Sequence, residues 1–283
     1  MRILIFGAEG QLGSELRRVL GAHHDLVPLS HREADITDLN RLMILTERIN
    51  PDVVINSAAY TDVDGCESDR DKAFLVNAIG ARNAAIAARR AKARIVHIST
   101  DYVFDGGKDG AYAEYDLPNP INVYGWSKLL GERMVAEQNP DSYILRVAWL
   151  YGPEGRNFVK TMISLAKAKD EIRVVNDQRG TPTFAGDVAE QIDMLIGTDS
   201  YGLYHCTSQG SCTWYEFAVE IFRLIGADIR VVPVSSSEFP RPARRPRNSV
   251  LDNLLLRVQG MDIMPHWRDS LRDHIDEVAG RVS

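Results

Sequence analysis

The sequence of 283 residues is poor in cysteine and histidine, and this scarcity limits the kinds of site that it can build. Its three cysteines, Cys66, Cys206 and Cys212, are too few and too scattered for a disulfide framework or a CxxC metal site. The 7 histidines are dispersed, and the chain has neither a GxSxG elbow nor a cysteine–histidine signature. These absences argue against a disulfide scaffold, a metal enzyme and the common hydrolases. A reducing cytoplasm suits such a chain best.

Positive charge and long apolar runs are also scarce. The 33 Lys and Arg residues are outnumbered by 39 Asp and Glu, and no basic block is long enough to follow a phosphate backbone, so no nucleic-acid partner is expected. No stretch reaches the roughly 18 apolar residues of a membrane span, and the apolar run at the start is too short for a signal peptide. We therefore expect a soluble, cytoplasmic protein without a membrane partner. The basic segment 241–249, RPARRPRNS, suits either a loop that holds one small anion or a merely solvated loop.

What the chain does contain is a regular alternation of strand-like and helix-like segments. The apolar run RILIF at 2–6 indicates a strand buried on both faces of a parallel sheet, and QLGSELRRVL at 11–20 places leucines at helical spacing. Further strands are expected within 25–30, 52–58, 93–100 and 142–152, with helices at 38–49, at 72–90 and after residue 122. This alternation predicts an α/β fold with a doubly wound parallel sheet of the Rossmann type, which binds ligands beyond the carboxyl ends of its strands.

The alternation weakens beyond Gly152 into shorter elements with several prolines and glycines. We place a domain boundary there, with a dinucleotide-binding Rossmann domain at 1–150 and a smaller mixed C-terminal domain at 151–283 that mainly binds the substrate. Some later segments are expected to return to the first domain. Helical patterns at 158–168 and 214–226, and an amphipathic helix at 269–283, are the main features of this second half.

A glycine-rich turn, GAEGQLG, joins the first strand to the first helix. Gly7 suits the tight turn, Gly10 lets the backbone approach a pyrophosphate at the helix N-terminus, and Gly13 allows the helix to pack closely on the strand. A glycine turn without a ligand is the alternative. The position between a strand and a helix favours a dinucleotide.

The end of the second strand should decide which nicotinamide cofactor is used, because an acidic residue there would repel a 2′-phosphate. The chain has Ser30 at this place and Arg32 close behind. A guanidinium can pair with a phosphate, so NADP(H) is favoured and NAD(H) stays open. Asp35 and Ile36 lie where an acidic and an apolar side chain commonly flank adenine.

Tyr124 and Lys128, in NVYGWSK, are four residues apart and share one face of the expected helix. A phenol has a reference pKa of about 10, and a nearby ammonium would lower it into the range of general acid–base catalysis. Ser99, Thr100 and Asp101 follow the strand just upstream, where a hydroxyl can donate to a carbonyl oxygen beside the phenol. The alternative is ordinary packing with a solvated charge.

The motifs GAEGQLG, NSAAYTDVD, HISTDYVFDG, NVYGWSK with GE after it, RVAWLYG, NDQRGTPT, GLYH and RPRNS together resemble the extended short-chain dehydrogenase/reductases. Within them the reductases of dTDP-linked 4-keto sugars are most similar, from Met1 to about Ser249. The resemblance implies a catalytic set of Thr100, Tyr124 and Lys128. It implies that Gly10, Gln11 and Leu12 lie under the pyrophosphate and that Ala59, Tyr60 and Thr61 run along the cofactor, which Tyr124 and Lys128 also contact. It implies that Thr100, Asp101 and Trp149 contact the sugar, with Val63 and Tyr102 as further candidates.

The implied reaction is hydride transfer to the 4-keto carbon of a dTDP-6-deoxyhexulose, with Tyr124 protonating the developing alkoxide. Some members of the family hold Mg²⁺ at a subunit interface through glutamates. Glu15 matches one such position, but Gly186 stands where another carboxylate would be expected. We therefore predict no metal, and we interpret Glu15 as an exposed helix charge. A homodimer, the exact sugar and the choice between thymidine and uridine stay open.

Three other functions are compatible with this family. A dehydratase is disfavoured because Asp101 is followed by Tyr102 rather than by the glutamate that elimination needs, whereas an epimerase can work with the same tyrosine and lysine. The regulatory subunit of methionine adenosyltransferase also resembles the family and binds NADP without needing turnover. It is disfavoured because all three catalytic positions are filled here.

Overall fold

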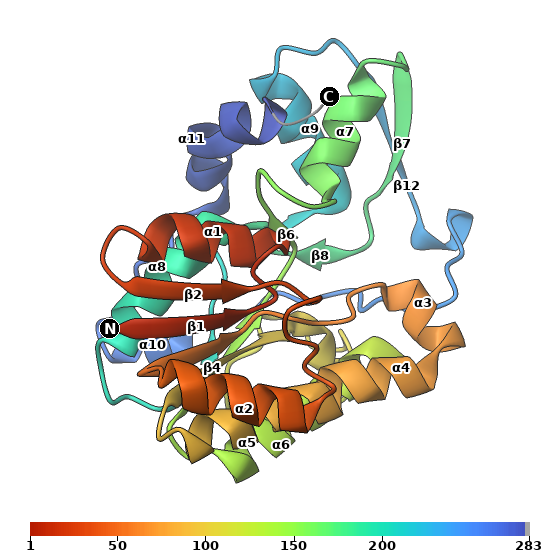
Figure 1. Cartoon of the computed structure of the whole chain (residues 1–283). Coiled ribbons are helices and arrows are strands. Elements are labelled where there is room, and N and C mark those ends of the chain that lie inside the picture. The colour runs from red at the N-terminus through yellow and green to blue at the C-terminus, as the bar shows by residue number, and fades with distance from the viewer. Residues whose placement is uncertain (281–283) are drawn as a thin grey trace.

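The computed structural model describes residues 1–280. Its centre is a six-stranded sheet in the order β10-β5-β4-β3-β1-β2, in which every neighbouring pair is parallel (Figure 1). The strands are β1 Arg2–Phe6, β2 Asp25–Leu29, β3 Val53–Asn56, β4 Arg94–Thr100, β5 Ser142–Val147 and β10 Gly202–His205. The predicted doubly wound Rossmann sheet is confirmed. Because the strand order reverses beside β1, the crevice between the ends of β1 and β3 is the expected ligand site.

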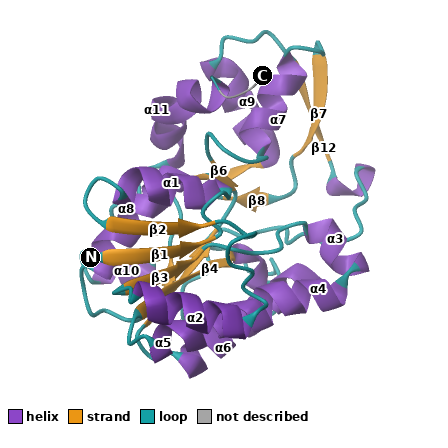
Figure 2. Ribbon diagram, in the orientation of Figure 1, coloured by secondary structure: helices purple, strands orange, loops and turns teal. Residues whose placement is uncertain are grey.

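Helices cover both faces of the sheet (Figure 2). On one face lie α1 Gln11–Leu20, α8 Ala185–Ile196 and α10 Leu254–Val258, and on the other α2 Leu39–Ile49, α5 Ala81–Arg90 and α6 Val123–Gln138. Leu12 and Leu16 of α1 join the first apolar core, while Leu42 and Leu45 of α2 join the second. Full burial of such a side chain contributes about 1.5–3 kcal/mol, so the apolar spacing seen in the sequence is what holds these helices on the sheet.

The helical stretch expected over 72–90 is confirmed, and it contains a π-helical turn that the sequence interpretation did not include. The chain forms α3 Val63–Ser68, α4 Arg70–Phe74 and a π-helical turn, η1 Leu75–Gly80, before α5 begins. The wider turn lets Asn77 accept a hydrogen bond from the Tyr60 amide at 2.8 Å and donate to the hydroxyl of Ser127 at 3.0 Å. A π turn often occurs at a functional site, and this one ties the segment after β3 to α6.

A smaller lobe lies above the carboxyl edge of the sheet (Figure 1). It contains β6 Leu150–Tyr151, α7 Phe158–Ala166, β7 Glu171–Val175, β8 Arg179–Gly180, β9 Thr183–Phe184, β11 Cys212–Thr213, α9 Trp214–Leu224, β12 Arg230–Val234, η3 Ser236–Glu238 and α11 Trp267–Ala279. Its core is built around Tyr151, Phe217 and Trp267. The helices at 158–168 and 214–226 are confirmed in type, and residues 281–283 of the expected C-terminal helix lie outside the described residues.

The single strand expected over 142–152 is divided into β5 and β6. β5 ends at Val147, and Trp149 adopts a positive φ of 45° before β6 pairs with β9. A positive φ is uncommon for a bulky residue. Here it turns the indole away from the sheet and toward the smaller lobe, where it stacks on Trp214. Among residues 1–280, no helix combines the length and the apolar character needed to cross a membrane.

Candidate active site

The glycine turn after β1 leaves no room for side chains at two of its positions. Gly7 has a φ of +77°, and a Cβ there would lie 2.7 Å from the amide nitrogen of Ala58. A Cβ on Gly13 would lie 2.2 Å from the carbonyl oxygen of Gly7. The first N–H groups of α1 therefore point from a tight turn into the crevice beside β3, and helix N-termini of this kind bind phosphate groups.

Helix α6 packs directly on the turn that follows β4. The side chain of Asn122 caps the helix by accepting a hydrogen bond from the amide of Gly125 at 2.8 Å. A Cβ on Gly125 would lie 2.1 Å from the carbonyl oxygen of Tyr102, so only glycine allows this approach. The contact brings Tyr124 next to Tyr102, with ring centroids 5.8 Å apart at an interplanar angle of 79°. Four residues later, the buried Lys128 donates to the carbonyl oxygen of Ile98 at 2.5 Å.

A cleft of about 560 Å³ opens where these elements meet, and we call it the catalytic cleft. It brings together residues that the sequence predicted for three roles: Gly10, Gln11, Leu12, Ala59 and Thr61 for the cofactor, Thr100, Tyr124 and Lys128 for catalysis, and Val63, Asp101, Tyr102 and Trp149 for the sugar. Its lining also includes Ser57, Ile98, Ser99, Val147, Leu150, Gly155, Arg156 and Trp214. The roles stay predictions, but the tertiary fold places these residues around one space.

The electrostatics of the two α6 side chains differ from the sequence interpretation. Tyr124 borders the cleft, yet burial of its hydroxyl group raises the pKa of the phenol, and a hydrogen bond with Thr100 opposes that rise only in part. Burial also lowers the pKa of Lys128 to about 8. The expectation that the ammonium depresses the phenol pKa is therefore wrong for this structure, because Lys128 Nζ donates to a carbonyl of β4 instead. Tyr124 keeps its proton at neutral pH, which suits a proton donor.

Asp101 and Tyr102 form the wall of the cleft beside the phenol of Tyr124. Burial raises the pKa of the Asp101 carboxyl to about 6, and hydrogen bonds with Ser249 and Thr100 oppose the rise. Thr100 Oγ1 donates to Asp101 Oδ1 at 3.0 Å. Such a carboxyl changes its charge close to neutral pH, and strongly perturbed groups of this kind cluster at functional sites.

The basic segment 241–249 lies behind this wall. Arg245 forms a two-pronged pair with Asp64 of α3, with N–O distances of 2.5 and 2.9 Å. This guanidinium is thus held by the protein's own carboxylate, while Arg241, Arg244 and Arg247 are exposed. Whether the segment binds an anion stays a prediction.

Two tryptophans from distant parts of the chain close the far side of the cleft. The rings of Trp149 and Trp214 are stacked, with centroids 3.4 Å apart and an interplanar angle of 6°. Gly180 of β8 allows this stack, since a Cβ there would lie 2.4 Å from the Trp149 ring. Sequence reasoning missed Trp214 and the exposed Arg156, because nothing in their local pattern distinguishes them from other lobe residues.

Several predicted cofactor residues lie outside the lining of the cleft. Gly7 and Gly13 shape the turn from behind, and the amide of Tyr60 bonds to Asn77. The amide and hydroxyl of Ser30 both donate to Glu33, at 2.8 and 2.7 Å, while Arg32 is exposed. Asp35 accepts from Thr37, and Ile36 is buried in the second core. A role for these four residues at the adenosine end stays a prediction.

Glu15, which matches a Mg²⁺-binding position of some family members, takes part in an ion pair. Glu15 is only 3% exposed, so its interpretation as an exposed charge is wrong. Its carboxylate is 2.6 Å from a guanidinium nitrogen of Arg18. A Cβ on Gly186 would lie 2.9 Å from the same nitrogen, so no second carboxylate enters from there. Within residues 1–280, no group of three or more His, Cys, Asp and Glu side chains is arranged to hold a metal ion.

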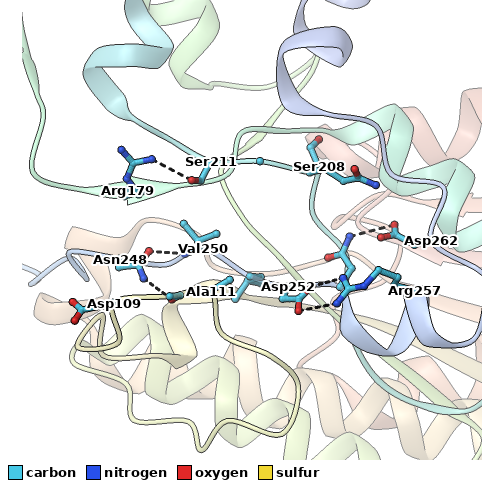
Figure 3. Close-up of a pocket in the computed structure, with 15 residues that line it drawn as sticks. Asp109, Ala111, Arg179, Ser208, Ser211, Asn248, Val250, Asp252, Arg257 and Asp262 are labelled. Carbon is cyan, nitrogen blue, oxygen red and sulfur yellow. Dashed lines mark hydrogen bonds and ion pairs between the residues drawn. The ribbon is translucent and has the colours of Figure 1, made fainter.

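A second hollow, of about 500 Å³, lies between the loop at 109–111, β8, the loop at 208–211 and the segment 248–253 (Figure 3). It includes none of the predicted site residues. Several of its polar groups bond to one another: Arg257 pairs with Asp252, Arg179 donates to Ser211 at 3.2 Å, and Asn253 donates to Asp262 at 3.4 Å. The catalytic cleft, by contrast, brings together a phenol, an ammonium and a carboxyl whose pKa values are shifted by burial.

Comparisons with a family model, with known sequences and with solved structures all indicate the same family. Residues 1–279 match the family model described as RmlD substrate binding domain. A dTDP-4-dehydrorhamnose reductase of Burkholderia thailandensis is 42% identical over 285 residues, which cover 95% of this chain and 96% of the relative. The structure of a dTDP-4-dehydrorhamnose reductase from Clostridium acetobutylicum has a TM-score of 0.96 and 49% identity, covering 98% of this chain and 99% of that one. The Bacillus anthracis dTDP-4-dehydrorhamnose reductase, in complex with NADP, has a TM-score of 0.96 and 44% identity, with the same coverage.

Proposed function

This chain belongs to the RmlD substrate binding domain family, and from that premise we propose that it is a dTDP-4-dehydrorhamnose reductase. It reduces the 4-keto group of dTDP-4-dehydro-L-rhamnose to a hydroxyl, giving dTDP-L-rhamnose, with NADPH as reductant. The observation that carries the proposal is the meeting of Thr100, Tyr124 and Lys128 with the N-terminus of α1 around one cleft.

The protein's part in the reaction is to bind, orient and move one proton. The bound nicotinamide supplies the hydride. Tyr124, whose pKa is raised, holds a proton that it gives to the substrate oxygen as negative charge develops there. Thr100, which hydrogen-bonds with the phenol, orients the keto group. Lys128 carries a positive charge below its pKa of about 8 and stabilises the phenolate that Tyr124 leaves behind.

The cofactor fits the residues at the end of β1. The amides of Gln11 and Leu12 open α1 toward the cleft, and the guanidinium of Arg156 is on the same lining. A pyrophosphate would therefore meet N–H donors, the positive end of a helix dipole and a cation. Ser30 and the exposed Arg32 favour a 2′-phosphate, and the NADP complex of the Bacillus anthracis relative agrees with this preference. NADH stays an alternative cofactor.

The sugar lies between the catalytic set and the tryptophan pair. Trp149 offers an aromatic face, which suits the apolar side of a deoxysugar. Asp101 accepts from a sugar hydroxyl when it is ionised, and Tyr102 and Val63 complete the wall. A sugar with the same nucleotide and a hydroxyl group in place of the 4-keto group would bind here but would not be reduced.

The test is to follow NADPH oxidation by absorbance with dTDP-6-deoxy-L-lyxo-4-hexulose generated in situ, and to repeat it with NADH and with and without Mg²⁺. Consumption of cofactor with appearance of dTDP-L-rhamnose supports the proposal and measures the cofactor preference. If the cofactor binds and is never oxidised, the proposed substrate is wrong. An epimerase or an NADP-binding regulatory subunit is then the better proposal for the function of this chain.

We further propose that the enzyme works in the cytoplasm. Cys66, Cys206 and Cys212 are free and buried, as a reducing compartment allows. A homodimer stays a prediction, and light scattering on the purified chain measures it. Fractionation of cells that express the protein at its natural level tests the location.

A further inference from the structure

A buried ion pair lies behind the catalytic helix, next to the cleft but not part of the reaction described above. Glu132 of α6 and Arg146 of β5 form two hydrogen bonds, Arg146 Nε to Glu132 Oε1 at 2.9 Å and Nη2 to Oε2 at 2.8 Å. The two side chains are 6% and 2% exposed. Removing an ion pair from water costs free energy. A pair buried this deeply does not serve to keep the surface soluble, so its role lies elsewhere.

The surroundings of the pair fix the carboxylate from a third direction. Ser99 Oγ of β4 donates to Glu132 Oε1 at 2.5 Å. On the far side, Arg146 Nη1 lies 3.4 Å from His205 Nε2, and the guanidinium stacks over the ring of Phe104 at 5.1 Å. Burial lowers the pKa of His205 to about 3, and Arg146 adds to the effect, so this histidine is neutral. The side chain of Glu132 thus accepts hydrogen bonds from two strands, which fix its orientation.

Glu132 comes four residues after Lys128, which comes four residues after Tyr124, so the three share one face of α6. Tyr124 and Asp101 line the same cleft as Lys128, and charge interactions link Lys128 to Glu132 of α6 and to His97 of β4. Burial and the charge of Lys128 keep the pKa of His97 well below its ordinary value, so His97 is neutral. Among these groups, Glu132 is the one whose charge raises the pKa of Lys128, against the lowering by burial.

We propose that Glu132 is a positioning residue, whose carboxylate, held by Arg146 and Ser99, keeps the Lys128 ammonium charged beside Tyr124. Helix spacing places Lys128 one turn before Glu132, whose carboxylate in turn pairs with the guanidinium of Arg146. Without the central negative charge, two buried cations would face each other along α6 and β5. The catalytic meaning of this device rests on the proposed reductase function, while the electrostatic link between the two residues does not.

The direct test is the ionisation of Lys128, measured by NMR titration of the protein labelled with ¹³C at the lysine ε-carbons, with Lys128→Met identifying its signal. We expect Glu132→Gln to lower the Lys128 pKa by at least about one unit, because the attraction of a buried charge is lost. Glu132→Asp, which keeps the charge, should stay close to the wild type. Glu137→Gln makes the same chemical change at an exposed position of α6 and should leave the signal unshifted.

A double variant covers the case in which Glu132→Gln leaves Arg146 unpaired and prevents folding. Glu132→Gln with Arg146→Met removes both charges, and it should lower the Lys128 pKa by less than the single variant, because the loss of the nearer carboxylate is only partly offset by the loss of the more distant guanidinium. An unshifted Lys128 titration in the folded single variant, or in the double variant if the single one does not fold, overturns the proposal.

The second readout is the pH profile of kcat for NADPH-dependent reduction. The ammonium is lost as pH rises, so the wild-type rate should fall above about pH 8, and the fall should begin about one unit lower in Glu132→Gln. A purely structural role would lower the rate equally at every pH. If the protein reduces no dTDP-4-keto sugar at all, the proposed function fails, yet the NMR titration still decides the link between Glu132 and Lys128.

Discussion

The catalytic cleft and the second hollow are similar in size, about 560 and 500 Å³, yet their chemistry is different. In the cleft, burial shifts the pKa values of Tyr124, Lys128 and Asp101. In the hollow, the guanidinium of Arg257 is exposed and already bonded to Asp252. The comparison teaches that volume is a poor guide to function, and that buried ionisable groups with few countercharges are a better one.

The origin of the difference is where each space lies in the fold. The catalytic cleft is bordered by the ends of parallel strands and by the N-terminus of α1, which point polar groups toward one place. The hollow is bordered mostly by loops that satisfy one another (Figure 3). Substitutions in the two regions should therefore have effects of different kinds and sizes.

The largest expected effect is the loss of turnover in Tyr124→Phe. The ring and its packing on Tyr102 remain, but the proton is gone, so kcat should fall by about 10²–10⁴-fold while NADPH affinity is kept. Single-turnover kinetics and fluorescence titration with NADPH measure the two quantities. A rate close to that of the wild type would remove the tyrosine from the mechanism.

A matched pair of glycine substitutions compares the two regions through the backbone. Gly13→Ala places a Cβ 2.2 Å from the carbonyl oxygen of Gly7, and such overpacking should lower the free energy of unfolding by about 1–3 kcal/mol. Gly110→Ala, at the rim of the hollow, meets no atom within 4 Å and should change it by less than about 0.5 kcal/mol. Urea unfolding of both variants is the measurement. Equal effects would mean that the turn after β1 can relax.

Trp214→Ala should raise KM for the sugar nucleotide about tenfold, since it removes the surface on which Trp149 stacks, a contact of about 0.5–1.5 kcal/mol beyond the area buried. Trp214→Phe keeps an aromatic face and should recover most of the loss. Trp126→Ala changes an exposed tryptophan on α6 and serves as the control. Steady-state kinetics at saturating NADPH separate KM from kcat. An unchanged KM would show that the stack does not support the sugar site.

A smaller effect is expected from the ionisation of Asp101. Its pKa of about 6 means that the carboxyl is charged above about pH 6 and neutral below it. A sugar hydroxyl donates more strongly to the charged form, so KM should rise up to about tenfold as the pH falls from 7 to 5. In Asp101→Asn this dependence should disappear. A wild-type KM that is flat over this range would contradict a contact between the carboxylate and the sugar.

The smallest expected effect is that of Arg257→Ala in the second hollow. Its pair with Asp252 is solvent-exposed, and exposed pairs contribute little to stability or function. We expect kcat/KM to change by less than about twofold. A large loss of activity would show that the hollow takes part in substrate binding, and the contrast between the two regions would fail.

Much of the fold could be predicted from local pattern alone. The apolar run of β1, the glycine turn and the leucine spacing of α1 are features of neighbouring residues, and hydrophobic periodicity is the strongest signal of secondary structure in a sequence. Two local irregularities could not be predicted in the same way. The π turn around Asn77 and the break at Trp149 depend on partners distant in the sequence, Ser127 and Trp214.

The same distinction between local pattern and distant partners holds for the residues of the candidate site. The glycines of the first turn and the spacing of Tyr124 and Lys128, together with the family resemblance, predicted the cofactor turn and the catalytic set, because these features can be seen in neighbouring residues of the sequence. Trp214 and Arg156 reach the cleft, and Glu132 meets Arg146, only through tertiary contacts. Their local sequence carries no sign of this.

The sequence by itself determined the parallel α/β architecture, the dinucleotide turn and the identity of the residues that can exchange a proton. Only the tertiary structure decided their ionisation, because a pKa depends on burial and on charges brought from other elements. Lys128 illustrates this point: its place one turn after Tyr124 predicted a depressed phenol pKa, but the fold directs its ammonium to the Ile98 carbonyl and places the Glu132 carboxylate beside it.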